Sequence, residues 1–183
     1  MQTSVALPRN QRVRLAELQD IPACAEIFGE WLASAAWMAV GQDLDLSVDH
    51  AENLKSRLDN QDEAMFVAED EDGIHGFVIV RAGTTPRTDI IHKLGSFARK
   101  ILGRPHRPRG NAQTATLEEI VVKPGRRNSY MSLALFNAAT AWCKDRQLTA
   151  IEGAVWAANE RIIRVSERIG FKPVRVLLRK ELD

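Results

Sequence analysis

Apolar side chains recur along the chain with two different spacings. A period of two, typical of half-buried strands, marks the segments 12–18, 65–70, 75–82, 115–124, 149–156 and 175–182. A period of about 3.6, typical of core-facing helices, marks 22–38, 47–60, 129–148 and 159–170. This order of elements predicts an α+β (mixed α/β) fold with helices on both faces of a central sheet.

Residues that favour caps and turns separate these elements. Asp20 and Pro22 predict a helix start, because Asp can cap free N–H groups and Pro fits the first turn. Ser47 or Asp49 is expected near the cap of the second helix. Asp72-Gly73 predicts the turn of a β-hairpin between the second and third strands.

Residues 82–113 form an insert between the third and fourth strands. It has about 30 residues, whereas the median connection has about 4–6. Apolar side chains recur at helical spacing from Ile90 to Leu102, and turn residues stand at both ends. We therefore expect an amphipathic helix with a basic outer face.

Length and composition indicate one globular domain. The 183 residues are 45% hydrophobic and 27% charged, so we expect a flexible tail at 1–10 and a single domain at 11–183. No apolar run approaches the roughly 20 residues of a membrane helix, and the N-terminus is too polar for a secretory signal. Cys24 and Cys143 cannot form a disulfide framework. These features predict a reduced, cytoplasmic protein with no membrane partner.

The net charge of +1 conceals two opposite blocks. Residues 15–72 carry fifteen acidic and two basic side chains, a local charge of −13, and residues 81–109 carry eight basic and one acidic, a local charge of +7. The blocks either pair with each other and with solvent, or each faces a partner of opposite charge. Nucleic acid is one candidate for the basic block, although no aromatic stacking platform accompanies it.

The chain lacks several other chemical signatures. The four histidines, His50, His75, His92 and His106, have no metal-ligand spacing, so we predict no metal site. No Ser/His/Asp arrangement, P-loop or dinucleotide fingerprint is present.

Two segments carry a family resemblance. Residues 117–148 read LEEIVVKPGRRNSYMSLALFNAATAWCKDRQL, and residues 151–174 read IEGAVWAANERIIRVSERIGFKPV. Both resemble the GNAT superfamily of acyl-CoA-dependent N-acetyltransferases, and so does RVRLAELQDIPACAEIF at 12–28. The resemblance covers nearly the whole chain except the tail and the insert. It implies a central mixed sheet that is mostly antiparallel.

The resemblance implies acetyl-CoA as co-substrate. In the family, a Gly-rich turn and the following helix start bind the pyrophosphate through backbone N–H groups. Here Arg127 fits that pattern, whereas Tyr130 and Ser132 replace its two glycines. The implied cofactor-binding residues are Ile120, Val121, Val122, Arg127, Asn128, Ser129, Tyr130, Met131, Ser132, Leu133 and Asn159, with Lys123 and Arg126 as further cations. Asn159 suits a helix cap equally well.

The resemblance also implies two catalytic roles. A Glu on the cofactor-binding strand serves as base, which favours Glu118 over Glu119. As neighbours in a regular strand, the two are expected to point to opposite sheet faces. Ser166 stands where many members place a Tyr acid, and the one tyrosine of the chain, Tyr130, lies in the phosphate turn. Ser166 or water is the candidate acid.

We therefore predict an N-acetyltransferase that moves an acetyl group from acetyl-CoA to a primary amine. An acidic rim (Asp43, Asp45, Asp49 and Glu52) would attract a cationic acceptor. One alternative is a weakened family fold that uses its cationic insert to hold an anionic partner or nucleic acid. Another is an acyltransferase that acts on nucleic acid. Family members often form dimers, so the resemblance is compatible with a homodimer, while the sequence itself gives no oligomeric state.

Overall fold

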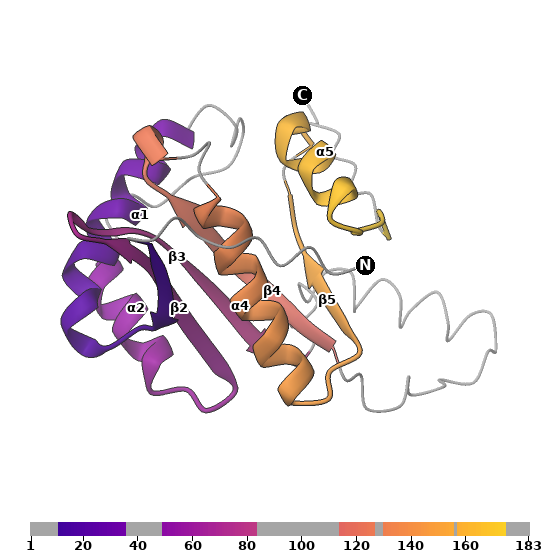
Figure 1. Ribbon diagram of the computed structural model, residues 1–183, viewed down its shortest axis with the longest axis horizontal. Helices are drawn as coiled ribbons and strands as arrows, with labels where there is room; N and C mark the ends of the chain where they lie inside the picture. Colours follow the sequence, from indigo (N-terminus) through magenta and orange to yellow (C-terminus); the bar gives the residue numbers. More distant parts are fainter. Residues whose placement is uncertain (1–10, 36–48, 84–113, 127–129, 156, 175–183) are drawn as a thin grey trace, which may run out of the picture.

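The computed structural model describes residues 11–35, 49–83, 114–126, 130–155 and 157–174 (Figure 1). Its strands are β1 (Arg12–Leu15), β2 (Glu63–Asp70), β3 (Gly73–Ala82), β4 (Thr114–Val122) and β5 (Ala150–Gly153). Its helices are α1 (Ile21–Ala35), α2 (His50–Leu58), α4 (Met131–Asp145) and α5 (Glu160–Arg168), with short 3₁₀ turns η1 (Leu18–Asp20) and η3 (Pro124–Arg126).

The five strands form one sheet in the order β1-β2-β3-β4-β5. The first four pair antiparallel, and β4 pairs with β5 in parallel. This confirms the predicted α+β class and the mostly antiparallel sheet. The expected basic helix at 90–102 and the last strand at 175–182 lie outside the described residues.

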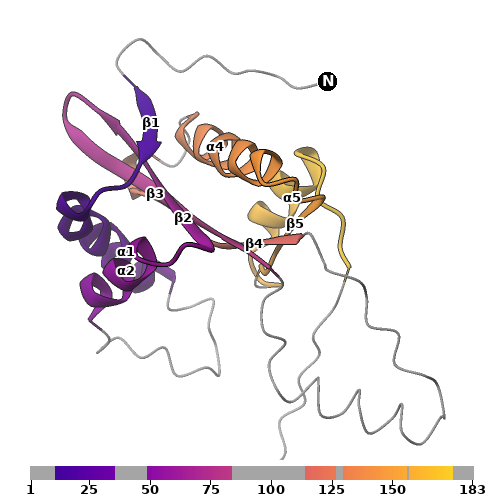
Figure 2. The same ribbon diagram turned by 90° about the horizontal axis from the view of Figure 1, so that it is seen from below.

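Helix α4 covers one face of the sheet (Figure 2). Alternate residues of β2, β3 and β4 point to it, because side chains of a strand alternate between faces. The fully buried members of this layer are Val78, Val80, Ala115, Met131, Leu135 and Ala139. We call this side the α4 face.

Helices α1 and α2 cover the opposite face (Figure 2). Their apolar sides pack on the other set of strand residues, namely Met65, Val67, Phe77, Ile79 and Val121, together with Cys24, Ile27 and Leu54. We call this side the α1/α2 face. Helices on both faces were predicted from the element order, and the structure confirms them.

The connection from β1 to α1 differs from its prediction. Asp20 was expected to cap the helix, but its carboxylate accepts bonds from Arg14 at 2.6 and 2.9 Å and from the Glu17 N–H at 2.8 Å. Arg14 also donates to Glu69 on β2 at 2.8 Å. Asp20 is 4% exposed, and the hydrogen bond from Arg14 lowers its pKa. The residue therefore ties β1 to the helix start.

Candidate active site

The expected catalytic and cofactor residues centre on β4, which is only partly paired with its neighbour β5. Thr114–Leu117 lie opposite Ala150–Gly153, and β4 then continues to Val122. Beyond the paired residues the two strands separate (Figure 1). In open sheets, ligands bind beyond the carboxyl ends of such parallel strands.

A β-bulge interrupts β4 at Glu118. Ile79 of β3 lies opposite Glu119, whereas Val80 lies opposite Leu117, so Glu118 is the extra residue. Leu117 and Ile120 both pack with the α4 face. Glu118 and Glu119, which stand between them, therefore share the α1/α2 face. The expectation that they point to opposite faces is wrong, because the bulge shifts the alternation by one residue.

Glu118 is held by an arginine of the adjacent strand. Its carboxylate forms an ion pair with Arg81, which lies on the same face of β3 as Phe77 and Ile79. The two side chains are 20% and 24% exposed. Such a half-buried pair keeps both charges neutralised in place, since separating them would leave one charge uncompensated.

Glu119 has a different environment. Its pKa is raised from 4.5 to about 7, mainly by burial; the charge of Arg57 on α2 opposes this rise, and the charge of Glu118 adds to it. No described basic side chain forms an ion pair with it. Arg57 instead pairs with Glu63 on β2 at 3.1 Å. The carboxyl group of Glu119 can therefore exchange a proton near neutral pH.

These side chains line up across the sheet. Glu63 lies opposite Arg81 in the β2–β3 register, and Arg81 lies one diagonal from Glu118 on β4. The charged row, as we call it, holds three carboxylates and two guanidinium groups: Glu63, Glu118, Glu119, Arg57 and Arg81. Sequence analysis identified only the two β4 glutamates, because the row joins residues from four separate elements.

The N-terminus of α4 follows β4 after a short connection. Tyr130 is the N-cap residue and makes no capping hydrogen bond with its side chain. It is 60% exposed, so its ring lies at the surface. Met131 is fully buried in the α4 face, and Ser132 and Leu133 are half-buried. The predicted Arg127, Asn128 and Ser129 lie outside the described residues.

The remaining predicted residues lie on α5. Asn159 caps this helix, and its side-chain oxygen accepts a hydrogen bond from the Ile162 N–H at 3.3 Å. Of the two roles considered for Asn159, the cap is therefore present. Ser166 is half-buried, and its backbone carbonyl accepts from Phe171 at 3.0 Å. Its role as an acid stays a prediction.

The β2–β3 hairpin holds Arg126, which sequence analysis assigned to a phosphate. The guanidinium lies 3.1 Å from Asp72 and 3.4 Å from Asp70. Its partners stand more than fifty positions earlier in the chain, so local sequence carries no signal for them. Only the predicted hairpin turn at Asp72-Gly73 could have directed attention there.

The same hairpin offers a group of residue types that metals use. The ligand atoms of Asp70, Asp72 and His75 all lie within 4.8 Å of one another. His75 contacts Asp70 at 2.6 Å, and Arg126 contacts both aspartates. The expected absence of a metal site therefore stays a prediction, which these three residues make testable.

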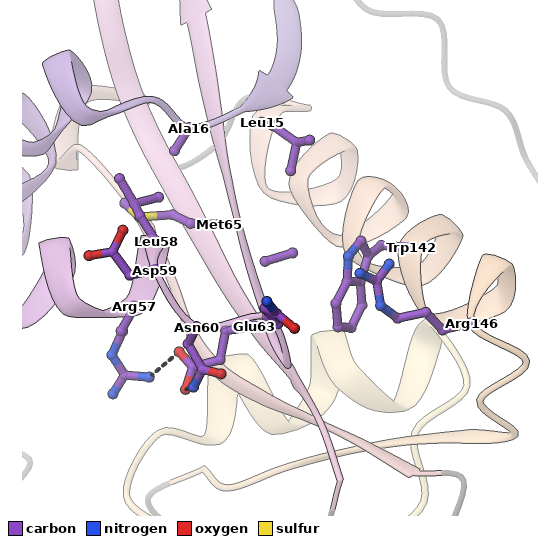
Figure 3. A pocket seen from close by; sticks show the side chains of 12 residues that line it. Leu15, Ala16, Arg57, Leu58, Asp59, Asn60, Glu63, Met65, Trp142 and Arg146 are labelled. Atoms are coloured by element: carbon purple, nitrogen blue, oxygen red, sulfur yellow. Dashed lines mark hydrogen bonds and ion pairs between the residues drawn. The ribbon is translucent and has the colours of Figure 1, made fainter.

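A hollow of about 420 Å³ lies at another edge of the sheet (Figure 3). It is bounded by the end of β1, the start of β2, the end of α2 and the last turns of α4. Arg57 and Glu63 belong to its lining, and Arg146 stacks over Trp142 with 4.0 Å to the ring centroid (Figure 3). Glu118 and Glu119 are not among its lining residues.

Neither cysteine has the character of a nucleophile. Cys24 and Cys143 are both unpaired and buried. Burial raises the pKa of Cys24 to about 12 and that of Cys143 to about 11. Since the thiolate is the reactive form, thiol catalysis does not suit these positions.

The sheet opens between two parallel strands, and the start of α4 follows β4 after a short connection. Residues 30–171 match the acetyltransferase (GNAT) family model. The chain therefore belongs to the GNAT family, as the sequence resemblance predicted. No curated protein matches the chain at a significant level.

Solved structures share the fold. A tetramutant of the BH1408 protein from Bacillus halodurans is 17% identical, with a TM-score of 0.73 over 93% of this chain and 99% of the other. A predicted acetyltransferase with acetyl-CoA from Clostridium acetobutylicum is 13% identical, with a TM-score of 0.64 over 93% and 96%. The aminoglycoside N-acetyltransferase AAC(6')-Iy in complex with CoA is 17% identical, with a TM-score of 0.60 over 96% and 99%.

Within the described ranges, none of the helices combines the length and the apolar character that a membrane span requires.

Proposed function

We propose that this chain is an N-acetyltransferase that moves the acetyl group of acetyl-CoA to a primary amine, with Glu119 as the general base. The observation that carries the proposal is the half-buried carboxyl group of Glu119, whose pKa burial raises. Glu119 stands just past the last residue of β4 that pairs with β5, and its pKa is about 7. A base works best when its pKa lies near the working pH. Membership of the GNAT family supports the reaction class.

The two glutamates have different roles in this proposal. Glu118 was the first choice as base, but Arg81 already neutralises it. Glu119 carries a negative charge above neutral pH without a described counter-ion. It can therefore attract an acceptor ammonium and take its proton, which turns the amine into a nucleophile.

Acetyl-CoA supplies the acetyl thioester. The neutral amine nitrogen forms a bond to the acetyl carbon and loses its second proton while the carbon–sulfur bond breaks, and the departing sulfur takes up a proton. The proton that Glu119 has accepted passes to solvent. Ser166 or water remains the candidate donor to sulfur. The backbone of β4 from Ile120 to Val122 stands beside the strand opening, where it would support the acyl and pantetheine groups.

The start of α4 would hold the pyrophosphate. The helix is fifteen residues long, and the partial positive charge at its N-terminus favours an anion. The side chain of Tyr130 points to solvent and leaves the end of the helix without a side-chain cap. The cap at Asn159 leaves its nitrogen donors available for the pantetheine arm.

A cationic amine is the acceptor class that the charged row favours. Its three carboxylates exceed its two guanidinium groups by one, so an ammonium group would balance it. Structural neighbours include an aminoglycoside acetyltransferase and a ribosomal-protein-alanine acetyltransferase. Amino sugars, polyamines and peptide N-termini are therefore the first acceptors to assay.

The alternative of a nucleic-acid-binding or partner-binding protein rests on the basic insert. That segment lies outside the described residues from position 84 onward, and the family match favours the enzyme. A cytoplasmic location and a homodimer remain part of the proposal.

The test has two stages. Acetyl-CoA should raise the unfolding temperature of the wild type in a saturable manner, by several degrees at a hundredfold excess over Kd. CoA release should then be followed with the acceptor panel for the wild type, Glu119→Gln and Glu71→Gln. Glu71 is exposed on the hairpin, so its variant is a matched charge control.

We expect Glu119→Gln to lower kcat about 100- to 10,000-fold, with acetyl-CoA affinity within about twofold of wild type. Glu71→Gln should match the wild type. Retained turnover in Glu119→Gln would remove the proposed base. No acetyl-CoA binding by the wild type would remove the proposed function itself.

A further inference from the structure

The turn between β2 and β3 contacts the segment that leads from β4 into α4. Arg126, the last residue of η3, reaches across to the hairpin and contacts Asp72 at 3.1 Å and Asp70 at 3.4 Å. Tyr130, the N-cap residue of α4, stands four positions later. The contact therefore fixes Arg126 only four positions before the helix start that would bind the pyrophosphate.

The hairpin side of this contact is firmly built. The Asp70 carboxylate lies 2.6 Å from His75 Nε2 and accepts a hydrogen bond from the Asp72 N–H at 2.9 Å. The side chains of Asp70 and His75 are 7% and 9% exposed. Gly73 completes the turn with a φ of 112°, a conformation that side chains disfavour. The two carboxylates are thus presented in one fixed arrangement.

Backbone contacts hold the same two segments together. The Lys123 N–H donates to the His75 carbonyl at 2.8 Å, which joins the two segments. Within the second segment, the Arg126 N–H donates to the Lys123 carbonyl at 2.9 Å. Gly76 brings β3 very close to β4, since a Cβ there would lie 2.6 Å from the Val121 carbonyl oxygen. Arg126 is therefore the outermost of a series of ties between the hairpin and the end of β4.

We propose that Asp70, Asp72, His75 and Arg126 form a hairpin anchor that positions the start of α4 for the CoA pyrophosphate. In this arrangement Arg126 is a positioning residue, and its guanidinium serves the two carboxylates and not a phosphate of the cofactor. The inference rests on the proposed function for its effect on acetyl-CoA. The anchor itself exists in the protein without ligand.

The competing role makes an opposite prediction for the aspartates. If Arg126 contacts a phosphate directly, removing Asp70 and Asp72 frees a cation and leaves acetyl-CoA affinity unchanged or tighter. If Arg126 works through the hairpin, removing the aspartates harms affinity as removal of Arg126 does. The sign of the aspartate effect therefore separates the two roles.

The experiment measures Kd for acetyl-CoA and kcat in Asp70→Asn/Asp72→Asn, Arg126→Gln and the triple variant. We expect each of these variants to bind acetyl-CoA about tenfold more weakly than the wild type. Its kcat should stay within about twofold of the wild-type value, because the charged row is unchanged. The triple variant should bind acetyl-CoA no more weakly than the weaker-binding of the other two variants, because all three variants remove the same contact. Arg126→Lys should recover part of the affinity.

The matched control is Glu71→Gln, which removes a charge from the same hairpin without a described contact to Arg126. It should bind acetyl-CoA as the wild type does. Asp72→Asn alone is the milder variant if loss of the buried Asp70 charge prevents folding, because Asp72 is 69% exposed. Unchanged or tighter binding in the aspartate variants, beside weaker binding in Arg126→Gln, would overturn the proposal.

Amide hydrogen exchange on the ligand-free protein gives a readout that does not depend on activity. The N–H groups of Lys123 and Arg126 should exchange faster in the anchor variants and at the wild-type rate in Glu71→Gln. Wild-type exchange in the anchor variants would contradict the anchor. If the wild type fails to bind acetyl-CoA while exchange responds as expected, the proposed function fails and the anchor stands.

Discussion

The two faces of the sheet are both covered by helices, yet they differ in chemistry. The α4 face is apolar along β2, β3 and β4, with Val78, Val80 and Ala115 fully buried. The α1/α2 face is apolar at Val67, Phe77 and Ile79 but becomes charged at the end where Arg81, Glu118 and Glu119 lie. The α4 face stabilises the fold through apolar burial, whereas charged side chains occupy part of the α1/α2 face.

This difference supports the proposed site on the α1/α2 face, because burying charge costs free energy unless the charges are paired. Arg57 pairs with Glu63, and Arg81 with Glu118, so the row is largely compensated. Glu119 is the uncompensated member among the described residues. A carboxyl group whose ionised form is destabilised in this way is a candidate for a functional site, which is the role that we propose for Glu119.

The largest expected effect on stability lies on the α4 face. Leu135→Ala removes a fully buried side chain and should lower the free energy of unfolding by about 2–5 kcal/mol. Urea unfolding measures this change. The pH profile of acetyl transfer should stay as in the wild type below the melting temperature. A displaced profile would mean that the two faces are not separate in role.

Glu119 should weaken the fold as pH rises. Its pKa is about 7 in the folded state against 4.5 in the reference state. The unfolded chain therefore binds fewer protons between these values, and stability falls by about 3 kcal/mol as pH rises through this window. Glu119→Gln should remove this loss and be the more stable protein at pH 8, with little gain at pH 4. Equal pH dependence in both proteins would contradict the raised pKa.

Glu118→Gln should act in the opposite direction at pH 8. It leaves the half-buried guanidinium of Arg81 without its counter-charge, which should cost about 1–3 kcal/mol. Thermal unfolding at pH 8 compares the two glutamine variants directly. If Glu118→Gln also stabilises the protein, the ion pair is not what distinguishes the two residues.

The elements of the fold were largely predictable, because periodicity is a local property of the sequence. The hairpin at Asp72-Gly73 and the helix cap at Asn159 follow from residue preferences that need no tertiary contact. Asp49 caps α2 for the same reason, with bonds of 3.0 and 3.2 Å to the Ala51 and Glu52 N–H groups.

The arrangement of the candidate site was not predictable in the same way. The orientation of Glu118 depends on a bulge. A bulge is a mismatch in register between two strands, so the sequence of one strand alone does not reveal it. The partners of Arg126 lie on a hairpin distant in sequence. Both features appear only when strands are placed in register.

A metal test gives the smallest expected effect. Arg126 already contacts Asp70 and Asp72 in the cluster that includes His75, so Zn²⁺ at about tenfold excess or EDTA should move the unfolding temperature by less than about 1 °C. A saturable rise with Zn²⁺ that is lost in Asp70→Asn/Asp72→Asn would assign this hairpin to a metal.

The most direct test of the account is the pH dependence of kcat/KM for acetyl transfer in the wild type and in Glu119→Gln. We expect the wild-type value to rise about tenfold per pH unit below pH 7 and to level off above it, and we expect this rise to be absent from the residual activity of Glu119→Gln. A wild-type profile that is flat through pH 7, or an unchanged rise in Glu119→Gln, would contradict the assignment of Glu119 as the base.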